Sequence, residues 1–238
     1  MRRVVSTAVV TVLVLGAGAA SAVRAPALRD PVRDTGHRPP VVFVLGDSYT
    51  VGTRGVRPEQ TYAAETARRL GWQPILAGHA GTGFVNTGMT GRGFGGLFEE
   101  QLGWRPAPDL MVIAGGHNDV WYPPGLVERN ARRLLAKIRK RWPRTRVVLV
   151  GPLWGGDPWP AALVVRDVLN EAADEQRVPF IDPLRERWIT GSVRTRTGNA
   201  PHYILPDGTH PTVTGSRYIA TRLVAELKRR GLAAYQGP

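Results

Sequence analysis

The sequence contains no cysteine among its 238 residues. This absence excludes a disulfide framework and an N-terminal lipid anchor attached to cysteine. Stability must therefore come from a hydrophobic core alone. A chain of this length is sufficient for one α/β domain with such a core, and it is too short for two domains once an N-terminal leader is removed.

Lysine and acidic residues are also scarce. Only three of the 32 basic residues are lysine, and the 19 acidic residues leave a formal charge of +13. The arginines are spread along the chain and form no basic stripe interleaved with aromatic residues, which argues against nucleic-acid binding. An arginine bias also accompanies a GC-rich genome, and a loose association of the basic surface with an anionic cell envelope stays open.

Residues 1–22 have the three parts of a secretory signal peptide. Two arginines form a basic start, residues 4–15 are apolar, and Ala20-Ser21-Ala22 is a cleavage site of the small-x-small type. Cleavage near Ala22 predicts a secreted protein. The alternative is an uncleaved membrane anchor, because the apolar stretch approaches the length that spans a bilayer.

Residues 23–40 are rich in Pro, Arg, Asp and Gly and are predicted to be a solvated linker to a domain at 41–238. In that domain, short runs that are apolar on both faces alternate with amphipathic helices. This alternation predicts an α/β fold, a single doubly wound and mostly parallel five-stranded sheet with helices on both faces. Strands are expected at 41–45, 73–77, 110–114, 147–150 and 178–181, and helices at 60–70 and 97–102 and around 127–142, 165–172 and 219–227, with Thr212 as an N-cap.

A serine follows directly on the first predicted strand. Ligand sites of open α/β sheets lie at the carboxyl ends of the strands, so Ser48 is placed where a nucleophile would lie, although Gly, Asp and Ser are also ordinary turn residues. The sheet would bring to the same edge the loop around Gly81, Asn118 after the third strand, and Asp207 and His210 before the last helix. Together they supply the nucleophile, base, carboxylate and oxyanion donors that acyl transfer to serine requires.

In this order the polar segments resemble those of the SGNH (GDSL-type) hydrolase family, and the leader and arginine bias suit a secreted bacterial, actinobacterial-like member. The matching segments are Gly46-Asp47-Ser48, Gly81 with its neighbours, Gly116-His117-Asn118-Asp119 for the G-x-N-D motif, and Asp207-Gly208-Thr209-His210 for D-x-x-H. The resemblance implies a flavodoxin-like fold and an esterase with Ser48 as nucleophile, His210 as base and Asp207 orienting His210. It also implies an oxyanion hole formed by the N–H groups of Ser48 and Gly81 and the amide of Asn118, and it implies no cofactor.

Two other functions stay open. An O-acetyl esterase or acyltransferase acting on carbohydrate or cell-envelope esters would use the same site, whereas a non-catalytic envelope-binding domain would have no need of an intact triad. The expected partner is a small-molecule or glycan ester, and a monomer is expected. No grouping of His, Asp or Glu has the spacing of a metal site, so no metal is predicted.

The neighbours of the site residues are given simpler roles. Asp47 and Asp119 are interpreted as braces that accept hydrogen bonds from loop amides. His117 is expected to point away from Asn118 and to face solvent or pack in a loop, and His79 and His202 to lie at the surface or the pocket rim. Loops at 91–96, 154–159 and 191–208 are expected to shape the pocket, with aromatic residues that either line it or pack under loops: Phe84, Trp121, Tyr122, Trp154 and Trp159.

Overall fold

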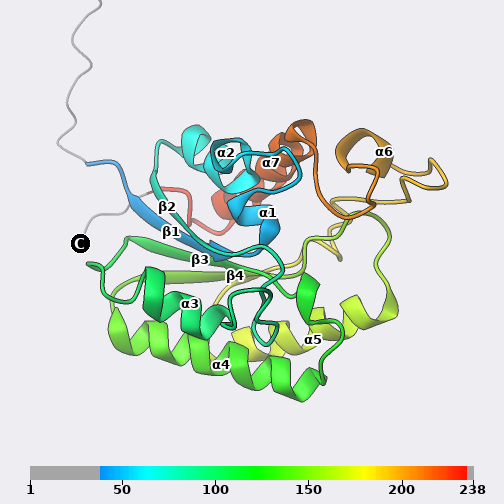
Figure 1. The fold of residues 1–238 in the computed structure, drawn as a ribbon. Helices are drawn as coiled ribbons and strands as arrows, with labels where there is room; N and C mark the ends of the chain where they lie inside the picture. Colours follow the sequence, from blue (N-terminus) through cyan, green and yellow to red (C-terminus); the bar gives the residue numbers. More distant parts are fainter. Residues whose placement is uncertain (1–37, 235–238) are drawn as a thin grey trace, which may run out of the picture. The chain divides into compact units, whose positions relative to one another are not determined.

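A computed structural model describes residues 38–234 of the protein; the predicted signal peptide and most of the predicted linker lie outside these residues. Five strands form one sheet in the order β2-β1-β3-β4-β5, and every neighbouring pair is parallel (Figure 1). This confirms the predicted parallel sheet. The strands are β1 Val41–Gly46, β2 Gln73–Gly78, β3 Leu110–Ala114, β4 Arg146–Val150 and β5 Phe180–Ile181.

Alternate residues of each strand point into two separate hydrophobic cores, because successive side chains of a strand lie on opposite faces. In β1, Val42 and Val44 contact the core beneath α2 and α7, whereas Phe43 and Leu45 contact the core beneath α3, α4 and α5. Figure 1 shows these two helical layers on either side of the sheet. The doubly wound arrangement is thus confirmed. The longer helices are α2 Tyr62–Leu70, α3 Phe94–Gln101, α4 Pro124–Arg141, α5 Pro160–Glu175 and α7 Val213–Arg229.

The helix ends follow local chemistry. Thr61 caps α2 through its side chain, and Gly71 ends α2 in the left-handed conformation that favours glycine. Thr212 caps α7 as predicted, by accepting a hydrogen bond from the N–H of Gly215 at 2.9 Å. Shorter elements complete the chain: α1 Ser48–Val51, the 3-10 helices η1 Pro58–Gln60 and η2 His117–Asp119, and α6 Ala200–Tyr203.

Several predicted bounds differ from the structure. The helix expected at 60–70 is divided by Thr61, which ends η1 and caps α2. The fifth strand is only two residues long instead of the expected four, because only Phe180 and Ile181 pair with β4. Helix α3 begins at Phe94 rather than near Leu97, and this buries Phe94 completely in the core.

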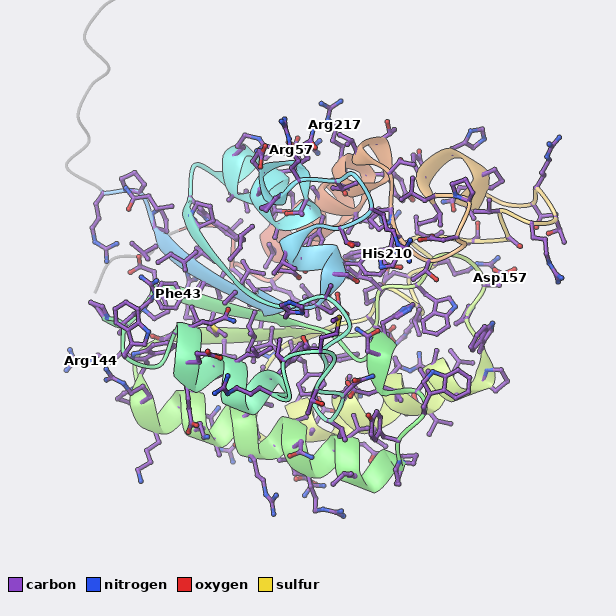
Figure 2. All side chains as sticks on the ribbon, viewed as in Figure 1. Phe43, Arg57, Arg144, Asp157, His210 and Arg217 are labelled. Carbon is purple, nitrogen blue, oxygen red and sulfur yellow. The ribbon has the colours of Figure 1, made fainter. Side chains whose placement is uncertain are left out.

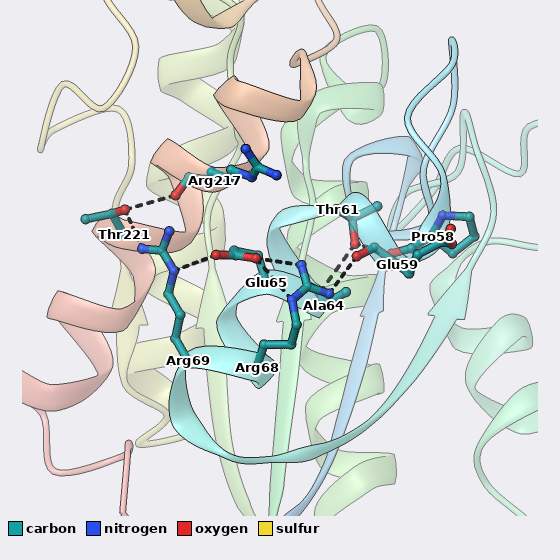
Figure 3. A network of polar contacts seen from close by, with 9 residues as sticks. All are labelled: Pro58, Glu59, Thr61, Ala64, Glu65, Arg68, Arg69, Arg217 and Thr221. Atoms are coloured by element: carbon teal, nitrogen blue, oxygen red, sulfur yellow. Dashed lines mark hydrogen bonds and ion pairs between the residues drawn. The ribbon is translucent and has the colours of Figure 1, made fainter. Parts of the chain in front are cut away.

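A polar network joins α2 to α7 at the surface (Figure 3). Glu65 pairs with both Arg68 and Arg69, and these pairs hold the pKa of Glu65 below its ordinary value although its partial burial acts in the opposite direction. Arg69 also donates to Thr221 Oγ1 in α7 at 2.6 Å. The network adds a surface contact between α2 and α7, and the loop that precedes α7 carries Asp207 and His210.

The carboxyl ends of the parallel strands lie at one edge of the sheet, as predicted. Figure 2 shows His210 near this edge and Arg144, which precedes β4, at the opposite end. Among residues 38–234, no helix is both long and apolar enough to cross a membrane.

Candidate active site

Ser48 is the first residue of α1 and follows the end of β1 by two residues. The turn requires glycine at position 46, since a Cβ there would lie 2.1 Å from Thr50 Oγ1. Asp47 caps α1 by accepting a hydrogen bond from the N–H of Tyr49 at 3.0 Å. Ser48 is thereby fixed at the sheet edge, with 7% of its surface exposed.

Asp207, His210 and Ser48 form a continuous chain of hydrogen bonds. His210 Nε2 lies 3.1 Å from Ser48 Oγ, and His210 Nδ1 lies 2.8 Å from Asp207 Oδ2. Asp207 Oδ1 also accepts the N–H groups of Thr209 and His210 at 2.9 and 3.0 Å, so the D-x-x-H segment forms a compact turn. This arrangement can move a proton from the serine hydroxyl to the imidazole while a carboxylate holds the ring.

The carboxyl group of Asp207 is stabilised in its charged form. Partial burial raises its pKa, but the hydrogen bonds from the His210 ring and from the amides of His210 and Thr209 outweigh this, and the pKa of Asp207 lies below its ordinary value. The guanidinium of Arg54 lies 4.0 Å from Asp207 Oδ2 on the exposed side. Asp207 is therefore ionised throughout the neutral pH range.

Tyr49 is a site residue that the sequence did not indicate. Its hydroxyl donates a hydrogen bond to the carbonyl of Thr209, and its buried ring lies 6.1 Å from the ring of His210. Burial raises the pKa of Tyr49, so the phenol stays protonated and remains a donor. This hydrogen bond links the segment that carries His210 directly to the helix that carries Ser48. The two residues that it joins are 160 positions apart in the sequence.

Asn118 and the loop around Gly81 lie together. The Asn118 side-chain amide donates to the carbonyl of Thr82 at 2.9 Å and reaches Asp47 Oδ2 at 3.5 Å. The second of these contacts is long, so one amide hydrogen is largely unused. Among the described residues, no protein acceptor receives the backbone N–H of Ser48 or of Gly81. Asn118 is thus hydrogen-bonded to the loop that follows Gly81 and to the residue before Ser48, and the N–H groups of Ser48 and Gly81 have no protein acceptor among the described residues.

Asp47 and Asp119 have bracing contacts, as predicted. Asp119 is fully buried and accepts the backbone N–H groups of Phe84, Val85 and Asn86 at 2.9 Å each, which shapes the loop after Gly81. Burial raises the pKa of Asp119, and it raises the pKa of Asp47 to about 7. Neither carboxyl contacts a histidine in the described part of the chain.

His117 and Asn118 bond to different partners, His117 to the carbonyl of Leu153 and Asn118 to that of Thr82, but the strand alternation from which their opposite directions were predicted is absent. Residues 117–119 form the 3-10 helix η2 rather than an extension of β3, so the alternation of a strand does not apply. Gly116 permits this turn with a positive φ of 109°, and a Cβ there would lie 2.8 Å from Leu169. His117 packs against Trp154 in a loop, as one of the predicted alternatives states, but it also borders the same cleft as Asn118.

A cleft of about 720 Å³ begins at the site. Of the site residues, Asn118 and Asp207 line it, together with Thr209, whereas Ser48 and His210 are not among its lining residues. One wall carries Trp154 and Trp159, and another is the turn at 191–197, in which Ser192 and Thr197 pair as an isolated bridge. Apart from the tryptophans, the lining residues are mostly polar or glycine, with Val120, Val193 and Pro206 as the aliphatic exceptions.

The predicted pocket loops are confirmed at 154–159 and 191–208, but not at 91–96. Gly93 instead backs onto the carbonyl groups of Gly83 and Phe84, and Phe94 is in the core. Of the five aromatic residues, Trp121, Trp154 and Trp159 line the cleft, whereas Phe84 and Tyr122 pack against the core. His79 and His202 are exposed and contribute nothing to the cleft walls.

The described residues offer no site for a metal ion. No group of three or more His, Asp or Glu side chains in residues 38–234 is arranged to ligate one. The groups that the structure brings together at this edge of the sheet are a hydroxyl, an imidazole and a carboxylate.

The sheet order, the helical layers and the position of the site define the fold of the SGNH hydrolases, an α/β fold of the flavodoxin type. The chain matches the model of the GDSL-like lipase/acylhydrolase family over residues 44–218 and belongs to that family. It is thus a hydrolase of the esterase class. Among curated proteins, no relative matches the sequence.

Solved structures with this fold include several esterases. A family two carbohydrate esterase from Clostridium thermocellum in complex with cellohexaose superposes with a TM-score of 0.64 at 19% identity, covering 83% of this chain and 67% of that one. A carbohydrate acetylesterase from Sinorhizobium meliloti superposes with a TM-score of 0.61 at 17% identity, covering 80% of this chain and 99% of that one. An aryl esterase from M. smegmatis superposes with a TM-score of 0.57 at 18% identity, covering 80% of this chain and 99% of that one. At these identities, the likeness establishes the shared fold.

Proposed function

We propose that the protein is a serine esterase that cleaves carboxylic esters through an acyl-serine intermediate. The observation that carries this proposal is the chain of hydrogen bonds from Asp207 through His210 to Ser48, with lengths of 2.8 and 3.1 Å. Membership of the acylhydrolase family supports it. The direct test is loss of ester hydrolysis on replacement of Ser48.

In the first half of the reaction, Ser48 Oγ attacks the ester carbonyl carbon while His210 Nε2 takes the hydroxyl proton. Asp207 holds His210 with its Nδ1 protonated, so that Nε2 is the free base. The tetrahedral intermediate collapses, the C–O bond to the alcohol breaks, and His210 returns the proton to the departing oxygen. The acyl group then remains on Ser48.

In the second half, His210 takes a proton from water, whose oxygen attacks the carbonyl carbon of the acyl-serine. The bond from that carbon to Ser48 Oγ then breaks, His210 returns the proton to Ser48 Oγ, and the acid is released. A saccharide hydroxyl in place of water would give acyl transfer, and analysis of the products with a sugar acceptor present distinguishes transfer from hydrolysis. In both halves the negative charge on the carbonyl oxygen is stabilised by the N–H groups of Ser48 and Gly81 and by the Asn118 amide. Each such donor contributes about 100-fold or more to the rate.

The composition of the cleft favours a saccharide ester over a long-chain lipid. A long acyl chain requires an aliphatic wall, whereas here polar and glycine residues surround three tryptophans. Trp121 and Trp159 expose 78% and 54% of their surface, and their rings lie 6.0 Å apart. Large exposed aromatic rings beside polar groups are suited to stack on the apolar face of a sugar. The carbohydrate esterases among the similar structures agree with this assignment.

Replacement of the exposed tryptophans is expected to impair saccharide esters selectively. Trp121→Ala and Trp159→Ala should each lower kcat/KM for an acetylated oligosaccharide about 10-fold or more, because each removes a ring that the sugar would cover. Hydrolysis of p-nitrophenyl acetate, which carries no sugar to cover the rings, should change less than about twofold. Steady-state kinetics with the two substrates measures both effects.

Trp104 provides the matched control, since it is 65% exposed but lies beyond the end of α3, where it donates to the carbonyl of Glu100. Trp104→Ala should leave both substrates unaffected. Equal losses on both substrates in the cleft variants, or no loss on either, would refute the saccharide assignment.

We further propose that residues 1–22 direct export and are removed. The basic start, apolar segment and Ala20-Ser21-Ala22 site support this. The N-terminal sequence of the exported protein should begin at Val23. Recovery of a protein that still carries Arg2 and Arg3 in the membrane fraction would instead indicate an uncleaved anchor.

A further inference from the structure

His117 is held in one tautomer by its surroundings. Its Nδ1 lies 3.0 Å from the carbonyl oxygen of Leu153. A carbonyl oxygen can only accept a hydrogen bond, so Nδ1 must carry the hydrogen. In a neutral imidazole the other nitrogen, Nε2, then carries a lone pair and acts as an acceptor.

The ring of His117 is also fixed in orientation. It lies 4.4 Å from the ring of Trp154 and 5.7 Å from that of Tyr49, and η2 holds its backbone. Burial lowers the pKa of His117, and the nearby His210 lowers it further. The hydrogen bond to the carbonyl of Leu153 acts in the opposite direction but does not outweigh them. The environment therefore favours the neutral ring.

The acceptor nitrogen has no partner within the protein. No group in residues 38–234 donates to His117 Nε2, although the ring is half-buried in the wall of the cleft. His117 precedes Asn118, a proposed oxyanion donor, in the sequence. The ring of His117 packs on that of Trp154, and the rings of Trp154 and Trp159 are 5.6 Å apart. We therefore expect His117 Nε2 to lie beside the part of the substrate that follows the ester, between the reacting carbonyl and the exposed tryptophans.

We propose that His117 Nε2 accepts a hydrogen bond from a hydroxyl group of the saccharide, next to the ester, and so determines specificity for sugar esters. This inference rests on the proposed esterase function and assigns a residue to the recognition of its alcohol. An acceptor that loses its water when substrate binds and gains no donor in exchange is costly, so substrates that supply the hydroxyl are favoured over those that lack it. His117 takes no part in proton transfer to or from Ser48.

Two variants separate this role from simple packing. His117→Asn places an amide near the position of Nδ1, so it can still donate to Leu153 but offers no acceptor at the position of Nε2. His117→Gln places its carbonyl oxygen near the position of Nε2 and restores an acceptor. His202→Asn is the matched control, because His202 is exposed on α6 and lies outside the cleft.

The experiment measures kcat/KM for an acetylated methyl glycoside, for its monodeoxy analogues that each lack one hydroxyl, and for p-nitrophenyl acetate. His117→Asn should lower kcat/KM for the parent glycoside about 10- to 100-fold, mainly through KM, and leave p-nitrophenyl acetate within about twofold. His117→Gln should recover part of the loss. In the wild type, one deoxy analogue should show a loss of similar size, and His117→Asn should not distinguish this analogue from the parent.

Equal losses by His117→Asn on the glycoside and on p-nitrophenyl acetate would overturn the inference, and so would no loss on either. Wild-type protein that hydrolyses p-nitrophenyl acetate but none of the glycosides would also overturn it, while leaving the esterase proposal intact. Failure of the esterase proposal itself would appear as a lack of hydrolysis of every ester by the wild type.

Discussion

Ser48→Ala is expected to lower kcat for ester hydrolysis by a factor of about 10⁴ or more, because it removes the only atom that forms the acyl intermediate. The fold should be retained. Ser48 Oγ contacts His210 and caps no helix, so alanine removes one hydrogen bond at the edge of the sheet. The residual rate would come from the oxyanion donors and from substrate binding.

Hydrolysis of p-nitrophenyl acetate measures the loss, and thermal unfolding measures the fold. Ser216→Ala is a matched control, because the buried hydroxyl of Ser216 in α7 has no partner among the described residues and takes no part in the site. The control should retain wild-type activity. A Ser48→Ala protein that kept more than about one per cent of the wild-type kcat would exclude Ser48 as the nucleophile.

Asp207→Asn is expected to lower kcat by a factor of about 10³ to 10⁴ with little change in KM. Asp207 uses one oxygen for two backbone N–H groups and the other for His210 Nδ1. An asparagine keeps the backbone bonds by its carbonyl oxygen, so its NH₂ group must face Nδ1. That group donates, which forces the hydrogen of the imidazole onto Nε2, where it can no longer take the proton of Ser48.

Steady-state kinetics and thermal unfolding again separate chemistry from stability. Asp167→Asn makes the same change on the exposed face of α5, where Asp167 pairs with Arg166, and it should leave kcat unchanged. The low pKa of Asp207 means that the wild type already carries the charge at neutral pH. An unchanged kcat in Asp207→Asn would show that His210 needs no orienting carboxylate.

The sequence was sufficient to predict the sheet and the convergence of the polar segments. Apolar runs such as 110–114 have no polar face, which only strands covered on both sides tolerate. Parallel strands place their carboxyl ends at one edge, so residues as distant as Ser48 and His210 were expected to meet. The 3.1 Å between Ser48 Oγ and His210 Nε2 agrees with that expectation.

The rest depended on contacts that no local pattern encodes. The contact of Tyr49 with Thr209 forms only when two distant segments pack together, and the hydrophobic periodicity of the sequence does not predict which distant segments do so. The position of His117 depends on η2, and the only local signal was the pair of glycines before it. The turn at 191–197 packs closely against Gly156. A side chain at Gly156 would prevent this approach, because its Cβ would lie 2.3 Å from the carbonyl oxygen of Gly191.

Labelling with a fluorophosphonate, followed by peptide mass mapping, tests the central claim most directly, because the reagent bonds covalently to an activated serine hydroxyl. The proposed mechanism predicts a single adduct on Ser48 in the wild type, a greatly reduced rate of labelling in His210→Ala, and none in Ser48→Ala. Folded wild-type protein that gains no adduct, or gains it on a residue other than Ser48, would contradict the assignment of Ser48 as the nucleophile.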